Sequence, residues 1–123
     1  MSDIDLAISH SKKLESLLRK HCDARGGGLH ELTDDVEHKL PADIVKKLRV
    51  VATVRNKIVH DADYTKIEQR RKFIRSAEAA EDHLIKLGDK RALTDGMFLR
   101  TAGFVAISFL VGVVIIIYLM WNL

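Results

Sequence analysis

Arg55, Asn56 and His60 are the residues of this sequence whose types and spacing could act on a phosphodiester. The guanidinium of Arg55 can hold a phosphate through two hydrogen bonds and stabilise the charge that develops on phosphorus. Histidine accepts or donates a proton near neutral pH, which here would serve the 2′-hydroxyl or the leaving 5′-oxygen of RNA. Asn56 would position a phosphate oxygen or orient the imidazole. The three residues therefore predict cleavage of RNA without a metal ion.

The spacing of these residues also predicts that one chain does not complete the site. Asn56 and His60 are four residues apart, so they share one face of a helix. Arg55 and His60 are five residues apart and point about 140° away from each other on an ideal helix. Two such helices that face each other across a dimer would complete the site. We therefore expect a homodimer or a higher oligomer.

Basic residues are concentrated around this motif. The stretch 44–60 contains five Lys or Arg residues and no acid, and the stretch 66–75 contains five against one acid. Two adjacent basic helices offer a surface for a polyanion such as RNA. The residues predicted to contact RNA are Lys46, Lys47, Arg49, Lys57, Arg70 and Arg71. Anionic lipid headgroups would account for the same charges, and both explanations stay open. Tyr64 and Phe73 are the only aromatic residues here, so base stacking has little support.

Helices are expected to position all of these residues. Apolar residues recur with a helical period in four stretches, 3–25, 29–39, 41–59 and 65–87. The glycine run 26–28 and Gly88 are expected to end the first and fourth helices, because glycine reaches the left-handed conformation that stops a helix. Pro41 suits the first turn of the third helix. The pattern predicts an all-α bundle of four to five helices in residues 1–88.

A linker and a membrane anchor are expected after this bundle. Residues 89–97 are predicted to form the linker, with a turn at Asp95-Gly96. The stretch 101–121 has no charged residue and would extend over roughly 30 Å as a helix, which is the thickness of a bilayer core. We therefore expect a single transmembrane helix at 98–123 that anchors the protein in the lipid bilayer. Basic residues precede it and none follows, which predicts a cytoplasmic N-terminal domain, at the inner membrane in a bacterium.

Metal and cofactor chemistry has little support in the sequence. Cys22 is the only cysteine, so it cannot form an internal disulfide. Cys22 follows His21, but no further ligands stand at a matching spacing. The expected site therefore contains no metal, and no cofactor is expected.

The hexapeptide Arg55-Asn-Lys-Ile-Val-His60 resembles the motif of the HEPN superfamily, in which an arginine and a polar residue precede a histidine late in a helix. The stretch 28–60 is similar to prokaryotic members that carry a Leu-Pro turn before this helix. The resemblance covers about residues 4–88. It implies a helical domain that dimerises and places two motifs in one composite cleft, with Arg55, Asn56 and His60 as the matching residues.

The resemblance also implies an activity, and it leaves an alternative open. Many HEPN members are metal-independent endoribonucleases with roles in toxin–antitoxin systems, phage defence or RNA processing. Others keep the fold and bind RNA, nucleotides or proteins without cleavage. The expected function is thus a membrane-anchored ribonuclease, or else a non-catalytic binding module in a membrane-associated complex. The expected partners are RNA, the bilayer and a second copy, with a regulatory protein that the sequence does not identify.

Overall fold

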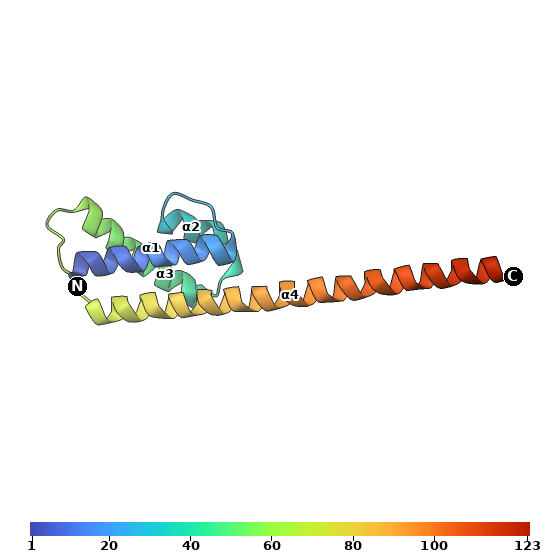
Figure 1. Cartoon of the computed structure of the whole chain (residues 1–123). Coiled ribbons are helices and arrows are strands. Elements are labelled where there is room, and N and C mark those ends of the chain that lie inside the picture. Colours follow the sequence, from blue (N-terminus) through green and yellow to red (C-terminus); the bar gives the residue numbers. More distant parts are fainter. The chain divides into compact units, whose positions relative to one another are not determined.

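The chain is helical almost throughout. The computed structural model spans residues 1–123 and describes all of them except the side chains of residues 99, 101, 102, 104 and 105. The elements in order are α1 (Asp3–Cys22), α2 (Leu29–Val36), the short 3-10 helix η1 (Glu37–Lys39), α3 (Ala42–His60) and α4 (Arg70–Asn122) (Figure 1). No strand occurs in the described part of the chain. The prediction of an all-α protein is confirmed.

The chain divides into two units, Met1–Gly88 and Asp89–Leu123. The first unit has the core, to which α1, α2, α3 and the first part of α4 contribute. Its largest fully buried apolar side chains are Leu14, Leu18, Leu32, Val36, Leu48, Val51, Phe73 and Leu84. With the buried Ala77 and Ala80 between Phe73 and Leu84, these positions recur every three or four residues within each helix. Each helix therefore turns one apolar stripe toward a shared interior. The second unit consists of the remainder of α4.

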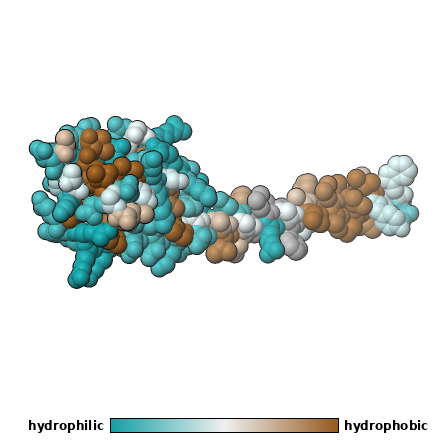
Figure 2. All heavy atoms as spheres, turned by 60° about the vertical axis from the view of Figure 1, so that its left-hand side comes forward, coloured by the Kyte–Doolittle hydropathy of each residue, from teal (hydrophilic) through white to brown (hydrophobic). Residues whose placement is uncertain are grey.

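The prediction of a transmembrane helix at 98–123 is wrong. Among the residues that the structure describes, no helix combines the length and the apolar character that a membrane crossing requires. Residues 99, 101, 102, 104 and 105 of the predicted span lie outside the described side chains. Exposed apolar side chains between 107 and 120 line this part of α4 (Figure 2).

The predicted helix end at Gly88 and the predicted turn at Asp95-Gly96 are also wrong, because α4 continues through both of them. The helix runs without a break through Gly88 and through Asp95-Gly96, and the predicted linker 89–97 is helical. A single glycine within a helix costs about 1 kcal/mol relative to alanine, which strong helix formers on either side can offset. Lysine, arginine, alanine and leucine occupy residues 90–93 and are such residues.

Asp23, and not a glycine, ends α1. Asp23 has a φ of 55° and lies in the left-handed region, and no glycine in the described chain has a positive φ. The N–H of Ala24 donates to the carbonyl of Leu18 at 3.2 Å, which satisfies one acceptor at the end of the helix. Aspartate is one of the few residues other than glycine that adopt the left-handed conformation. Glycine at 26 has another role, because a Cβ there would overlap Glu31 of α2.

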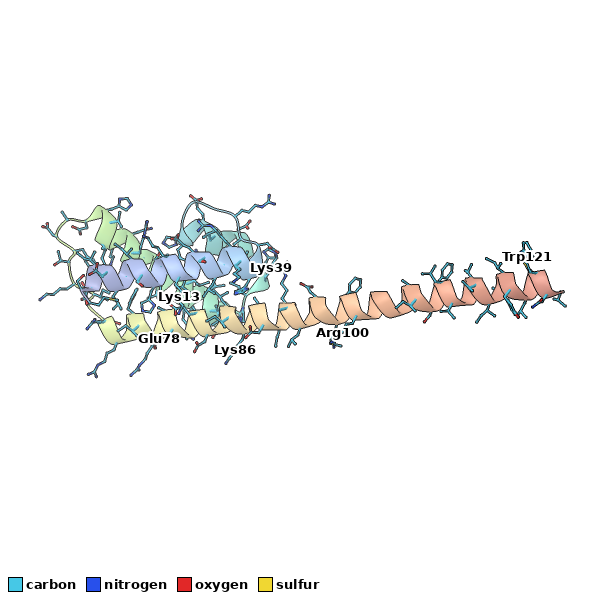
Figure 3. All side chains as sticks on the ribbon, viewed as in Figure 1. Lys13, Lys39, Glu78, Lys86, Arg100 and Trp121 are labelled. Carbon is cyan, nitrogen blue, oxygen red and sulfur yellow. The ribbon has the colours of Figure 1, made fainter. Side chains whose placement is uncertain are left out.

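A buried carboxylate joins α4 to α1. Glu81 accepts from Lys13 Nζ at 2.6 Å through Oε2, and its Oε1 lies 2.6 Å from His10 Nδ1. Only 6% of the Glu81 side chain is exposed, whereas Lys13 remains 55% exposed. The hydrogen bond and the charge of Glu81 raise the pKa of Lys13 above its ordinary value. Lys13 on α1 and Glu78, one turn before Glu81 on α4, mark the two helices in Figure 3.

Replacement of Gly88 by alanine is expected to lower the free energy of unfolding by about 1–3 kcal/mol. A Cβ at Gly88 would overlap the imidazole ring of His21, so α1 and α4 can approach here only because residue 88 has no side chain. Gly96→Ala is the matched control in the same helix, since a Cβ there meets nothing within 4 Å. That control should gain up to about 1 kcal/mol of helix propensity. Urea unfolding followed by circular dichroism separates the two, and equal stabilisation by both changes would contradict the close approach.

Candidate nucleic-acid interface

Five cations from two helices surround one open hollow on the first unit. The hollow has a volume of about 720 Å³, and its cations are Lys47 from α3 and Arg70, Arg71, Lys72 and Arg75 from the start of α4. We call it the basic hollow. Glu68, in the segment between α3 and α4, is the acidic residue in its lining. Residues 71 and 75 are four apart, so their side chains share one face of α4.

Three of these cations remain available for a ligand. Arg70 Nε lies 3.0 Å from Asp3 Oδ1, and Lys47 Nζ lies 3.5 Å from Asp43 Oδ2. Arg71, Lys72 and Arg75 have no ion pair among the described residues and are exposed. Exposed cations that carry no partner attract phosphate groups from solution at little desolvation cost.

The predicted RNA-contacting residues only partly meet in this place. Lys47, Arg70 and Arg71 line the basic hollow, as predicted residues of one surface would. Lys46 is exposed on α3 but does not line the hollow, and Lys57 lines a smaller cavity beside it.

Arg49 contacts two carboxylates of neighbouring helices. Its Nη2 donates to Asp34 Oδ1 and to Glu37 Oε2, both at 2.8 Å, so it ties α3 to α2 and η1. The hydrogen bonds to Asp34 and Glu37 raise the pKa of Arg49 above its ordinary value. With two carboxylates already bound, this guanidinium offers little positive potential to RNA.

Lys72 and Arg75 also line the basic hollow, although they are not among the residues that the sequence predicts to contact RNA. Their signal was present in the spacing, because residue 75 follows Arg71 by one helical turn and residue 72 adjoins it. The face of α4 that they occupy borders the basic hollow together with Lys47 of α3.

Arg55 and Asn56 lie together, half-buried, near the end of α3. Arg55 Nη1 donates to Asn56 Oδ1 at 3.3 Å. Both line a cavity of about 250 Å³ together with the loop before α2 and the first residues of that helix, including His30 and Glu31. Glu31 Oε2 already accepts from the N–H of Gly27 at 2.8 Å, and its carboxylate would repel a phosphate entering this cavity.

His60 lies outside this cavity. It is the last residue of α3 and is exposed, and no contact among the described residues joins it to Arg55 or Asn56. The structure therefore brings two of the three motif residues together and leaves the histidine apart. A site that used Arg55 and His60 on the same phosphate would need a second copy of the chain, as the spacing predicts.

No family model, curated protein or solved structure matches this chain. The resemblance to the HEPN superfamily thus stays a prediction that rests on the motif 55–60 and its place late in α3.

Side chains that can bind metal ions do not cluster in the described part of the chain. No three His, Cys, Asp or Glu side chains there are grouped so that they could hold a metal ion. Cys22 is buried within the core of the first unit.

Proposed function

We propose that the first unit is an RNA-binding domain that holds the phosphate backbone in the basic hollow. This proposal rests on one observation. Five cations, Lys47, Arg70, Arg71, Lys72 and Arg75, line the same open cavity. Arginine matches the geometry of a phosphate through two parallel hydrogen bonds, so three arginines in one hollow favour a phosphodiester ligand. The resemblance of the motif 55–60 to RNA-cleaving domains supports RNA as the polyanion.

The double variant Arg71→Ala/Arg75→Ala is expected to bind single-stranded RNA more weakly and with less salt dependence. Each lost phosphate contact on a single strand lowers the slope of log affinity against log salt by about 0.7, so two lost contacts lower it by about 1.4. Neither residue is in an ion pair in the described chain, so the fold should be unaffected. Fluorescence anisotropy of a labelled RNA over a range of salt concentrations measures both quantities.

A matched control separates the position of the charges from their number. Lys12→Ala/Lys20→Ala removes the same charge from exposed positions of α1, which does not line the basic hollow. This control should keep nearly the full salt slope. Equal losses in both double variants would mean that RNA responds to net charge alone, and the proposal would then fail.

A metal-independent endoribonuclease is the second candidate, and the exposure of His60 favours it. An imidazole at the surface end of α3 is open to a substrate and to a second copy of the chain. In this candidate, Arg55 of one copy stabilises the charge on phosphorus while His60 of the other transfers the proton. Asn56 holds the Arg55 guanidinium through the bond at 3.3 Å.

His60→Ala is expected to lower the rate of RNA cleavage by about 10²- to 10⁴-fold, the range that general acid–base catalysis contributes. The measurement follows RNA fragments in excess EDTA, with the full chain at concentrations where its oligomeric state is known. Arg55→Ala should cause a comparable loss, whereas His38→Ala, an exposed histidine on η1, should cleave as the wild type does. RNA left intact by a dimeric wild-type protein would reject cleavage and leave the binding proposal in place.

A further inference from the structure

A second, smaller cavity adjoins the basic hollow and has a partly apolar lining. Its volume is about 150 Å³, and Val50 and Val54 of α3 with Phe73 of α4 form apolar parts of its lining. Tyr64 and Lys57 also line it. We call this cavity the ring pocket. Glu68, Gln69 and Lys72 line both the ring pocket and the basic hollow, so the two cavities are adjacent.

The segment that carries Tyr64 is fixed at both ends. The N–H of Tyr64 donates to the carbonyl of Asp61 at 3.1 Å, and the N–H of Asp63 donates to Asp61 Oδ1 at 3.0 Å. Further along, the N–H of Ile67 donates to Asp3 Oδ2 at 2.9 Å, and the Ile67 side chain is buried. These bonds fix the backbone that carries the half-buried Tyr64 ring, and this ring lines the pocket. A ring held in place loses little conformational entropy when a ligand stacks on it.

Charged and polar side chains stand around the Tyr64 ring and could match the base and phosphates of one nucleotide. Lys57 Nζ lies 5.6 Å from the centroid of the Tyr64 ring, so an ammonium group stands beside the aromatic face. The apolar wall suits the face of a base, and Glu68 and Gln69 offer acceptors and donors for its polar edge. Lys57 and Lys72 suit the phosphates on either side of that base.

We propose that the ring pocket binds one unpaired nucleobase of the RNA strand whose phosphates lie in the basic hollow, an inference that rests on the proposed function. The base stacks on Tyr64, and Lys57 turns from the ring to the neighbouring phosphate. The cavity is smaller than the roughly 300–1,000 Å³ of sites for drug-sized ligands, which limits it to a single ring system. The domain therefore prefers single strands, because a base within a duplex cannot enter the pocket.

The test compares two polyanions, of which only one has bases. The full-length protein is titrated with a short single-stranded RNA of mixed sequence and, separately, with inorganic polyphosphate that competes for the basic hollow. Tyr64→Leu is expected to weaken RNA binding by about 5- to 150-fold while the affinity for polyphosphate stays within about twofold. Tyr64→Phe, which keeps the ring, should restore the preference for RNA over polyphosphate.

Each outcome separates this inference from the proposed function. If Tyr64→Leu binds both ligands as the wild type does, the ring pocket does not bind a base. If Arg71→Ala/Arg75→Ala leaves RNA affinity unchanged, the basic hollow itself is not the RNA site. The polyphosphate affinity of Tyr64→Leu also reports its fold, since an unfolded domain would lose both ligands. Wild-type protein that binds an RNA strand and an abasic strand of equal length with equal affinity would likewise overturn the inference.

Discussion

Phe73→Ala is expected to lower the free energy of unfolding by about 3–5 kcal/mol, as the loss of a large buried aromatic side chain does in other cores. Phe73 is only 1% exposed and belongs to the core of the first unit. Its ring also meets the His10 ring edge to face, with centroids 5.9 Å apart, which contributes a further fraction of the loss. Urea unfolding monitored by circular dichroism measures the change.

Phe98→Ala is the matched control for this prediction. Phe98 stands on the same helix but is 74% exposed and lies in the second unit, so its removal should change stability by less than about 0.5 kcal/mol. Similar losses for the two changes would mean that Phe73 is not a core residue. Phe73 also lines the ring pocket, so its alanine variant is a test of stability and should not be used as a test of binding.

Glu81→Ala is expected to cost about 2–3 kcal/mol of unfolding free energy. The change removes two hydrogen bonds of 2.6 Å at a nearly buried carboxylate and leaves His10 and Lys13 without their shared acceptor. Hydrogen bonds to charged groups contribute about 1.5–3 kcal/mol each. Because Lys13 is largely exposed, water replaces its bond to Glu81 in the variant, and the total loss of unfolding free energy stays below the sum of two such bonds. Glu78→Ala, at an exposed position one turn earlier on α4, should lie within about 0.5 kcal/mol of the wild type.

The pH dependence gives a second check on the same cluster. Because Glu81 raises the pKa of Lys13 above its ordinary value of 10.5, the folded state holds this proton more tightly than the unfolded state. The stabilisation is complete below pH 10.5 and is lost as the pH rises through the raised pKa. The gap in stability between wild type and Glu81→Ala should therefore narrow above pH 10.5. A gap that stays constant into strong alkali would show that the charge of Lys13 does not contribute.

The helical character of this protein could be predicted from the sequence because it depends on local patterns. Leu14 and Leu18 on α1, and Leu48 and Val51 on α3, recur at helical spacing, and all four are fully buried. A helix satisfies its backbone hydrogen bonds within itself, so a period of three to four apolar residues is enough to predict both the element and its buried face.

Helix ends were harder to predict because competing signals differ by only about 1 kcal/mol. The sequence predicts a helix end at Gly88, but α4 continues through this residue. Because Gly88 has no side chain, His21 of α1 can approach α4 closely here. The left-handed conformation that ends α1 was expected in the glycine run 26–28, but it occurs at Asp23. The length of apolar chain at 98–123 suggested a membrane span, and the described residues contain no helix that meets its requirements.

The tertiary structure alone decides which charged side chains contact one another. Arg49 and Lys47 stand two residues apart, yet Arg49 is bound by Asp34 and Glu37 while Lys47 lines the basic hollow with residues of α4. Glu81 contacts His10 and Lys13 of α1. Arg55 lines a cavity beside the loop before α2, whereas His60 lies outside that cavity. The sequence determines the helices and the apolar stripe of each, because these follow from backbone hydrogen bonding and burial between near neighbours. The partners of each charged side chain depend on where helices cross, and that position is set by packing among residues far apart in the chain.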